Sequence, residues 1–231
     1  MVELEKNSAM KAKQHTIYKL KDGKRVAGVT TITGVLDKPA LKFWANQLGL
    51  AGVKVQAYVD DLAAIGTLAH YLIECHIKKV TPNLDDSSKN QIDKAENSFL
   101  KFLEWEKQHK IQFLNSEMAL VSEKHRYGGT IDIYCVLDGV YTLLDIKTCK
   151  GLYPDQDLQV GGGYFPLLVE NGHKVEQAVI VKVGRSDDEG LNAECRVIPN
   201  LAGYQKMFLL CKDIYEIKKE LCWERKGNYA D

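Results

Sequence analysis

Two aspartates in the middle of the chain have the type and spacing of groups that bind a metal ion together. Asp132 lies in the run from Thr130 to Leu137, and Asp145 lies in the run from Val140 to Thr148. Both runs are rich in β-branched and aromatic residues, and they flank Asp138-Gly139. An Asp-Gly pair between two such runs strongly predicts a β-hairpin with a two-residue turn.

The hairpin also predicts which residues face each other. If Leu137 faces Val140, counting outward along the two strands pairs Asp132 with Asp145. Directly opposed residues hold their Cβ atoms roughly 5 Å apart on the same face of a sheet. Lys147 follows Asp145 by two residues, so the strand period returns its side chain to that face.

Two carboxylates that face each other across a ladder repel, so they need a cation between them or a shared proton. Carboxylate oxygens suit hard ions such as Mg²⁺ or Mn²⁺. The alternative is that the hairpin slips or bends, that Asp132 faces solvent, and that Lys147 forms an ordinary surface ion pair with Asp145. The hairpin alone does not decide between these two interpretations.

A longer ordered series surrounds the hairpin. It comprises Gly66-Thr67-(x)2-His70-(x)3-Glu74, Gly128-Gly129-Thr130-Ile131-Asp132, Asp145-Ile146-Lys147-Thr148, and Gln159 with Tyr164. This series resembles the RecB-like exonuclease branch of the PD-(D/E)XK nuclease superfamily, to which phage-type exonucleases and the mitochondrial genome maintenance exonuclease belong. The phrase from Gly28 to Leu50 also resembles the start of the phage proteins, so the resemblance covers the chain from about Tyr18 to Arg185.

The resemblance implies a metal-dependent DNA exonuclease that works from DNA ends in phage or bacterial recombination or repair. Its metal would be Mg²⁺ or Mn²⁺, and the implied ligands are His70, Asp132, Asp145, the backbone carbonyl of Ile146 and Glu117. Lys147 would act in catalysis with the two aspartates. The implied substrate-binding residues are Gln159, Tyr164, Lys150 and Thr130. DNA is the implied partner, together with a single-strand annealing or recombination protein.

The chain departs from the family pattern in two places. No proline precedes Asp132, so the literal Pro-Asp pair is absent. Gln159 and Tyr164 are five residues apart instead of four, which turns the second side chain about 140° round an α-helix instead of about 40°. One explanation is that only one of the two side chains reaches the site, and we expect that one to be Gln159. The other explanation is that the helix bulges there. Whether Glu117 points to the site depends on a register that the sequence does not fix.

Other function classes remain open at this stage. An endonuclease of the same fold would carry the same residues, and a catalytically silent DNA-binding module could retain the fold alone. The intact Asp132, Asp145 and Lys147 set argues against the silent module. A metalloenzyme that acts on another substrate has no motif in its favour, because the chain has no His-Glu-x-x-His, Gly-x-Ser-x-Gly or Walker-type phosphate loop.

Composition predicts one soluble α/β domain. The chain has 231 residues, and its 31 basic and 31 acidic residues cancel, so contacts to DNA must come from local basic patches. The six cysteines are scattered without a Cys-x-x-Cys pair, which favours reduced thiols in a cytoplasmic setting, that of the bacterial host if the protein is phage-encoded. We expect a single nuclease domain made of a loose tail (1–13), an N-terminal hairpin and helical part (15–110), a catalytic sheet core (115–200) and a C-terminal helix (201–231).

The predicted architecture is a mixed central β-sheet flanked by helices, with a restriction-endonuclease-like αβββαβ core. A second hairpin is expected around Asp22-Gly23 with a basic edge, and Asp37 is expected to cap a helix whose Phe43 and Trp44 lie in the core. The other expected helices span 53–78, 90–108, 158–170 and 201–223, after a loop over 151–157. Glu117 is expected to open the first central strand, and later strands are expected over 175–183 and 194–198.

Overall fold

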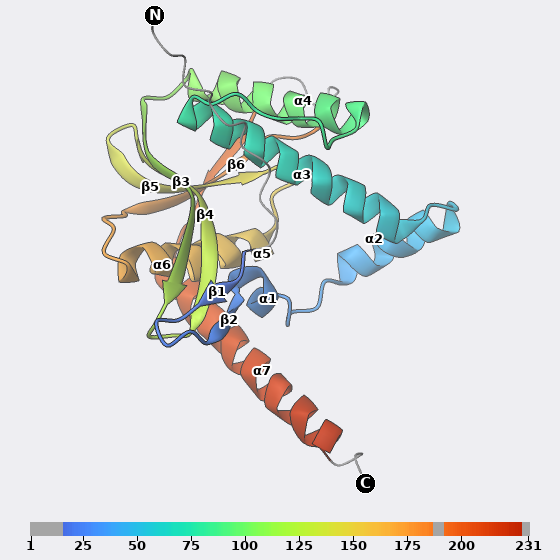
Figure 1. Ribbon diagram of the computed structural model, residues 1–231, viewed down its shortest axis with the longest axis vertical. Helices are drawn as coiled ribbons and strands as arrows, with labels where there is room; N and C mark the ends of the chain where they lie inside the picture. The colour runs from blue at the N-terminus through green and yellow to red at the C-terminus, as the bar shows by residue number, and fades with distance from the viewer. Residues whose placement is uncertain (1–15, 187–191, 228–231) are drawn as a thin grey trace, which may run out of the picture.

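The structure is a computed structural model that describes residues 16–186 and 192–227 (Figure 1). The predicted tail over 1–13 lies outside these residues. The strands are β1 (Tyr18–Lys19), β2 (Arg25–Gly28), β3 (Ile111–Ser122), β4 (Tyr127–Leu137), β5 (Val140–Lys147), β6 (Gln177–Lys182) and β7 (Glu194–Val197). The helices are α1 (Val29–Thr33), α2 (Pro39–Leu50), α3 (Val55–Lys78), α4 (Lys89–Glu106), α5 (Pro154–Asp157), the π-helix η1 (Leu158–Tyr164), α6 (Phe165–Glu170) and α7 (Leu201–Gly227). None of the described helices is both long enough and apolar enough to cross a membrane.

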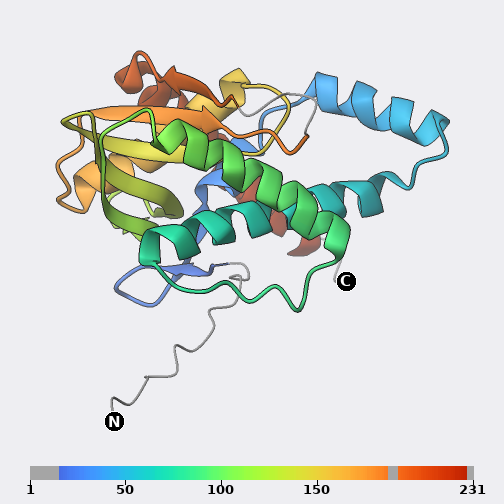
Figure 2. The same cartoon turned by 90° about the horizontal axis from the view of Figure 1, so that it is seen from above.

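The strands form one mixed sheet with helices on both faces, which confirms the predicted α/β class. The sheet order is β1-β2-β4-β5-β6-β7. One edge of β4 pairs first with β2 and then with β5, and β3 pairs along the opposite edge. Helices α3 and α4 lie side by side over one face, whereas α1, η1, α6 and α7 cover the other (Figures 1 and 2). The connection from β5 through α5, η1 and α6 to β6 joins two parallel strands, so it is a crossover.

The hairpin of β4 and β5 has the predicted register from its turn up to the residues just before Asp132 and Asp145. Leu137 pairs with Val140, and the ladder continues to Ile133 opposite Leu144, where it ends. Ile131 packs with η1 and α7, whereas Ile133 packs with α3 and α4, so β4 changes face at Asp132. The expected ladder pair of Asp132 with Asp145 is therefore wrong, because β4 bends at Asp132 and no longer pairs with β5 there.

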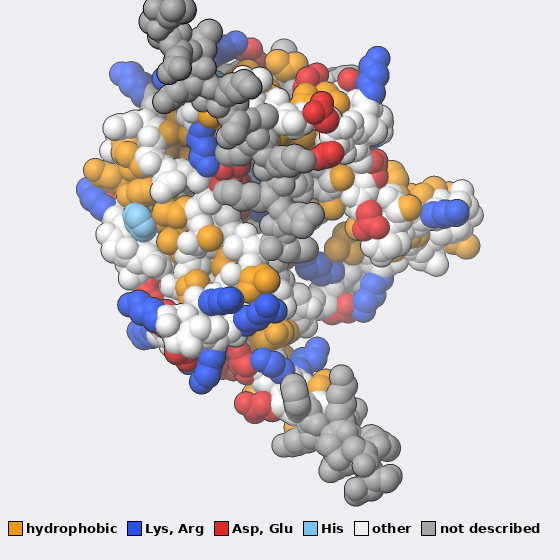
Figure 3. All heavy atoms as spheres, viewed as in Figure 1, with side chains coloured by type: hydrophobic (Ala, Val, Ile, Leu, Met, Phe, Trp, Pro, Cys, Tyr) orange, Lys and Arg blue, Asp and Glu red, His pale blue; other side chains and the backbone are white. Residues whose placement is uncertain are grey.

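The N-terminal part differs from expectation in how it packs. The hairpin of β1 and β2 forms, but helix α2 begins after Lys38, and Asp37 accepts a hydrogen bond from the Lys38 N–H without capping the helix. Phe43 and Trp44 were expected in the core and are 67 % and 37 % exposed. Helix α2 buries none of its residues, because α3 and α4 already cover that face of the sheet, and it forms an apolar arm that projects from the body (Figure 3).

Two further boundaries differ from the sequence prediction. Strand β3 begins at Ile111, six residues before Glu117, because Ile111 and Phe113 pack against the core under α4. The expected loop over 151–157 contains the short helix α5, whose first turn begins with a proline.

The helix expected over 158–170 is divided by the π-helix η1, and its three glycines serve packing. A Cβ atom on Gly162 would lie 2.5 Å from the backbone oxygen of Tyr204 and 2.9 Å from the Cβ of Phe208, both in α7. A Cβ atom on Gly163 would meet Val29 at 2.5 Å. The glycines therefore allow η1 to lie directly against α7 and α1.

Replacing Gly162 with alanine is expected to destabilise the fold. The added methyl group would collide with a backbone atom that cannot move alone, and overpacking of this kind costs about 1–3 kcal/mol in the free energy of unfolding. Gly49→Ala in α2 is the matched control, because its Cβ would meet no atom within 4 Å. That control is expected to gain about 0.5–1 kcal/mol from helix propensity. Urea denaturation would measure both, and equal stability of the two variants would contradict the packing role.

Candidate active site

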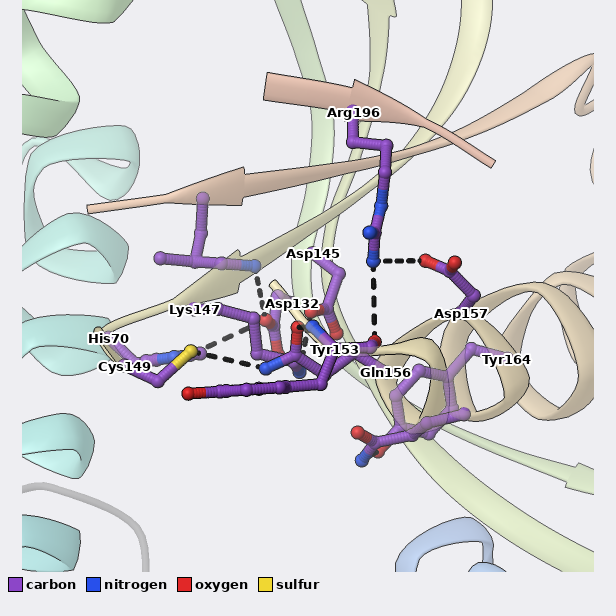
Figure 4. Close-up of polar contacts among 12 residues, drawn as sticks. His70, Asp132, Asp145, Lys147, Cys149, Tyr153, Gln156, Asp157, Tyr164 and Arg196 are labelled. Carbon is purple, nitrogen blue, oxygen red and sulfur yellow. Dashed lines mark hydrogen bonds and ion pairs between the residues drawn. The ribbon is translucent and has the colours of Figure 1, made fainter. Parts of the chain in front are cut away.

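Helix α3 brings His70 to the point where β4 and β5 separate. A Cβ atom on Gly66 would lie 3.2 Å from the hydroxyl of Thr148, so the glycine lets the helix approach the end of β5 closely. One turn later, the Nδ1 atom of His70 lies 3.5 Å from an Oδ2 atom of Asp132 (Figure 4). In the sequence series, Gly66 thus lets α3 lie close to the end of β5, and His70 then places its imidazole next to Asp132.

The carboxylate of Asp132 fills the gap that the bent hairpin leaves. Its Oδ2 atom accepts a hydrogen bond of 2.9 Å from the backbone N–H of Ile146 in β5. Because Lys147 uses its carbonyl to accept from Val183, the residue just after β6, the peptide groups of Ile146 must face the opposite edge, toward β4. The Ile146 carbonyl therefore lies on the same edge of β5 as Asp132.

Glu117 is turned toward the same place by an unusual backbone conformation. Its φ angle is +50°, in the left-handed region, although it lies within strand β3. Its neighbours Ser116 and Met118 pair with Ile133 and Ile131, which places Glu117 beside Asp132. The sequence left this orientation open, and the structure places the carboxylate at the site.

His70, Glu117 and Asp132 form a group with the composition of a metal site. One ligand atom from each residue lies within 4.8 Å of the other two. The three side chains line a small pocket, which has room for about one water molecule or one ion. Carboxylate oxygens and an imidazole nitrogen suit Mg²⁺, Mn²⁺ and related divalent ions.

The left-handed backbone of Glu117 predicts a difference between two substitutions. A non-glycine residue in this region carries strain of about 1–2 kcal/mol, which glycine relieves. Glu117→Ala and Glu117→Gly both remove the carboxylate, but only the glycine also removes the strain. The glycine variant is therefore expected to be more stable than the alanine variant by about 1 kcal/mol. Urea unfolding in EDTA would measure this difference, and an alanine variant as stable as the glycine variant would contradict the strain.

Asp145 and Lys147 lie beside this group as an ion pair in which the aspartate is buried and the lysine is half-buried. Asp145 is 2 % exposed, and its Oδ2 lies 2.5 Å from the Nζ of Lys147. That buried oxygen nevertheless accepts no hydrogen bond of ordinary geometry from the described residues. An acceptor left in this condition fits a site that takes a further donor or a cation. The predicted proximity of Lys147 to Asp145 on one face is confirmed.

The electrostatics of the cluster depend on how these charges balance. Burial alone would lower the pKa of His70, but the carboxylates of Asp132 and Glu117 outweigh burial and raise this pKa to about 9. Burial raises the pKa of Asp145 to about 6, with Asp132 adding to the rise and Lys147 opposing it. A protonated imidazole therefore offsets one of the two negative charges of Glu117 and Asp132, and a divalent cation bound by the neutral imidazole would offset both.

Burial shifts the pKa values of Asp132 and Lys147 in opposite directions, and neighbouring charges outweigh it in both cases. It would raise the pKa of Asp132, but His70 and Lys147 outweigh it and hold this pKa below its usual value. It would lower the pKa of Lys147, but Asp145 and Asp132 outweigh it, so this pKa lies above its usual value. Asp132 is therefore ionised and Lys147 is charged at neutral pH.

The π-helix resolves the irregular spacing of Gln159 and Tyr164. A π-helix has i to i+5 hydrogen bonds, so residues five apart share a face. The Nε2 atom of Gln159 donates a hydrogen bond of 2.9 Å to the hydroxyl oxygen of Tyr164. Burial raises the pKa of Tyr164 well above its usual value, and the nearby Asp145 and Asp132 carboxylates raise it further. The sequence alternative of a bulged helix is therefore the one that the structure has.

The two glycines before Asp132 accommodate tyrosine rings. A Cβ atom on Gly129 would lie 2.7 Å from the ring of Tyr164, and one on Gly128 would lie 2.3 Å from the side chain of Tyr18. The hydroxyl of Tyr18 also lies 2.9 Å from the hydroxyl oxygen of Thr130. Thr130 is thus engaged by Tyr18, a residue that sequence reasoning missed because nothing in its surroundings distinguished it.

A second network outside the sequence series holds the π-helix in place. Arg196 of β7 donates hydrogen bonds from its Nη2 atom to the Oδ1 atom of Asp157 at 2.6 Å and to the backbone oxygen of Tyr153 at 3.3 Å (Figure 4). The hydroxyl of Tyr204 donates to the other oxygen of Asp157 at 3.2 Å. These contacts fix the residue just before η1, and no spacing in the sequence signalled them.

The remaining residues named from the sequence lie at the edge of the site. Lys150 is exposed, and its backbone oxygen accepts a hydrogen bond from Lys182 at 3.2 Å. Glu74 lines the pocket and forms an ion pair with Lys78. The basic residues of the first hairpin are exposed, and Lys and Arg side chains gather over that region of the surface (Figure 3).

Comparison with known proteins adds a distant structural likeness. No family model matches the chain, and no curated protein sequence matches it. Among solved structures, an alkaline exonuclease from Laribacter hongkongensis aligns with a TM-score of 0.42 and 10 % sequence identity, over 88 % of this chain and 93 % of that one. A likeness at this level carries no functional argument, so the function must be argued from the site itself.

Proposed function

We propose that this chain is a metal-dependent deoxyribonuclease that hydrolyses phosphodiester bonds from DNA ends. The observation that carries the proposal is the convergence of His70, Glu117 and Asp132 on one small pocket, with the ion pair of Asp145 and Lys147 beside it. Clustered acidic groups next to a charged lysine are typical of sites that stabilise the transition state of phosphoryl transfer.

The three clustered residues would hold a divalent ion such as Mg²⁺ or Mn²⁺, with Asp145 and the Ile146 carbonyl as further oxygen ligands. When bound, such an ion would polarise a phosphoryl oxygen and lower the pKa of a coordinated water. Two observations fit this role, namely the buried Oδ2 of Asp145, which has the Lys147 ammonium as its ion-pair partner but no hydrogen bond of ordinary geometry, and the strained backbone that turns Glu117 inward. Strain of this kind is concentrated at functional sites.

Lys147 would hold positive charge where negative charge develops. Its pKa is raised, so its ammonium group keeps its proton at neutral pH, and Asp145 fixes its position through the 2.5 Å contact. From there it orients the attacking water and offsets charge on the phosphoryl group. A group that remains charged and is held before the reaction starts needs no reorganisation during it.

Tyr164 and Gln159 would position the DNA backbone. Because the Tyr164 oxygen already accepts from Gln159, its own proton remains available for a further acceptor such as a phosphate oxygen. The pKa of Tyr164 is raised, so its hydroxyl group is neutral and does not repel the phosphate. Lys150, exposed after the end of β5, would add a phosphate contact.

The experiment that tests this function compares linear and circular DNA. Linear duplex and single strands labelled at either end, and a closed circular plasmid, are incubated in Mg²⁺, Mn²⁺ or EDTA with the wild-type protein and with Asp145→Asn. Progressive loss of end label that needs metal and Asp145, with the circle intact, is the expected result, and the end that loses label first gives the polarity. A nicked or cut circle would favour an endonuclease, and bound but intact DNA would favour a silent binding module.

A further inference from the structure

Helix α7 carries two separate apolar faces. The first packs against the body of the protein through residues that are buried or half-buried, namely Leu201, Tyr204, Phe208, Cys211 and Tyr215. The second is exposed to between 43 % and 56 %, and it consists of Met207, Leu210, Ile214, Ile217 and Leu221. We call this second set the α7 seam. A helix that only covers its own core needs one apolar stripe, so the α7 seam is an excess of apolar surface.

The spacing of the α7 seam is that of a coiled coil. Its residues follow one another at intervals of three, four, three and four, which places them at alternating a and d positions of a heptad repeat, with Met207, Ile214 and Leu221 at a. Helices with this repeat pack against each other with a and d side chains in the interface. Scattered surface apolar residues have no such period, so the pattern indicates a helical partner.

The position of the helix leaves room for that partner. The N-terminal half of α7 packs against η1 and α1, while its C-terminal half projects away from the sheet (Figure 1). Within the described part of the chain, no element packs over the α7 seam. Because α7 is already helical where it packs against η1 and α1, association through it does not require a new helix to nucleate.

The charges beside the α7 seam select a second copy of this chain. Asp213 occupies a g position and Lys218 the following e position, both exposed and without an ion-pair partner among the described residues. In a parallel pair, g of one helix faces the following e of the other, so each Asp213 would meet Lys218 of the second copy, twice by symmetry. In an antiparallel pair, g residues face g residues, so Lys206 would meet Glu220 but Asp213 would meet Asp213 of the second copy, and the parallel pair avoids that repulsion.

We propose that the α7 seam joins two copies of this chain through a parallel, in-register coiled coil. The seam covers 207–221, about two heptads, which is shorter than the roughly three to four heptads of a self-sufficient coiled coil. The association is therefore reversible, and it depends on protein concentration. This inference does not rest on the proposed nuclease activity, and either can fail without the other.

Sedimentation of the full chain over a wide range of concentrations tests the proposal. The mass is expected to rise with concentration from that of a 26.0 kDa monomer toward twice that value. Ile217→Glu, which places a charge in the centre of the seam, is expected to remain monomeric throughout. Leu100→Glu is the matched control, because Leu100 is 48 % exposed on α4, outside the seam, and this variant is expected to associate like the wild type.

A cysteine at an a position tests the orientation. In a background with Cys195→Ser and Cys222→Ser, which removes the two exposed thiols, Ile214→Cys is expected to form an intermolecular disulfide on mild oxidation, because a positions of parallel helices lie next to each other. The background without Ile214→Cys is expected to stay uncrosslinked. A chain that is monomeric at every concentration, or an association that survives Ile217→Glu, would overturn the proposal, and association without this disulfide would overturn the parallel arrangement.

Discussion

Asp132→Asn is expected to reduce metal-dependent DNA hydrolysis by about a thousandfold or more, because a metal ion supplies several kcal/mol of transition-state stabilisation and about 1.4 kcal/mol corresponds to tenfold in rate. The substitution removes one charge from the group of His70, Glu117 and Asp132. It keeps an oxygen that can accept the hydrogen bond from Ile146. The loss would therefore come from the metal site and not from the fold.

The measurement is the initial rate of release of end label, together with the urea unfolding curve in EDTA. Asp138→Asn is the matched control, since it makes the same change at the exposed turn of the same hairpin, where the φ angle of +50° is one that asparagine adopts readily. We expect the control to keep the wild-type rate. Hydrolysis by Asp132→Asn at near the wild-type rate would remove Asp132 from the site.

Lys147→Met is expected to lower the rate by about a hundredfold to a thousandfold, the usual effect of removing one preorganised group that stabilises developing charge. Methionine keeps most of the aliphatic side chain and removes the ammonium group. The substitution leaves Asp145 without its ion-pair partner, and burial already raises the pKa of Asp145. Asp145 can therefore take up a proton, which limits the loss of stability.

Rate and metal binding are measured together for this variant, because the expected result separates the two. The divalent ion should still bind, since Lys147 is not among its ligands and the ion displaces the proton that Asp145 takes up in its absence, while turnover is lost. Lys182→Met is the matched control, because Lys182 occupies the neighbouring position in β6 directly across from Lys147 and pairs with Glu194 instead. A Lys147→Met protein that turns over at the wild-type rate would contradict the proposed role of the lysine.

The sequence predicted the central hairpin because the information was local. A two-residue turn between two apolar runs leaves one register, and the pairs from Leu137 to Ile133 follow it. The prediction failed at Asp132 because the face that each residue presents there depends on which helices pack above and below. Ile131 and Ile133 contact different layers, and this competition bends the strand.

The orientation of Glu117 and the pairing of Gln159 with Tyr164 depended on backbone conformations that residue types do not specify. A glutamate with a positive φ angle is unfavourable in isolation, so tertiary contacts must impose it. The five-residue spacing did indicate that an α-helix could not serve both side chains. Only the packing of Gly162 and Gly163 against α7 and α1 shows why a π-helix is accommodated there.

For helix α2, the sequence predicted buried aromatic side chains and the structure shows exposed ones. Phe43 and Trp44 are large and apolar, and residues of this type are usually buried, so the prediction of a core position followed the general rule. The sequence does not state how many helices a sheet face can hold. With α3 and α4 already in place, α2 remains outside, and its aromatic side chains lie on an exposed arm.

The most direct test of the central claim is an anomalous difference map from crystals of the wild-type protein that contain Mn²⁺. We expect a peak within coordination distance of the His70 imidazole and the Glu117 and Asp132 carboxylates, and we expect crystals of Asp132→Asn to lack this peak. A manganese peak elsewhere, or none at this pocket in a protein whose DNA hydrolysis requires Mn²⁺, would contradict the proposed metal site.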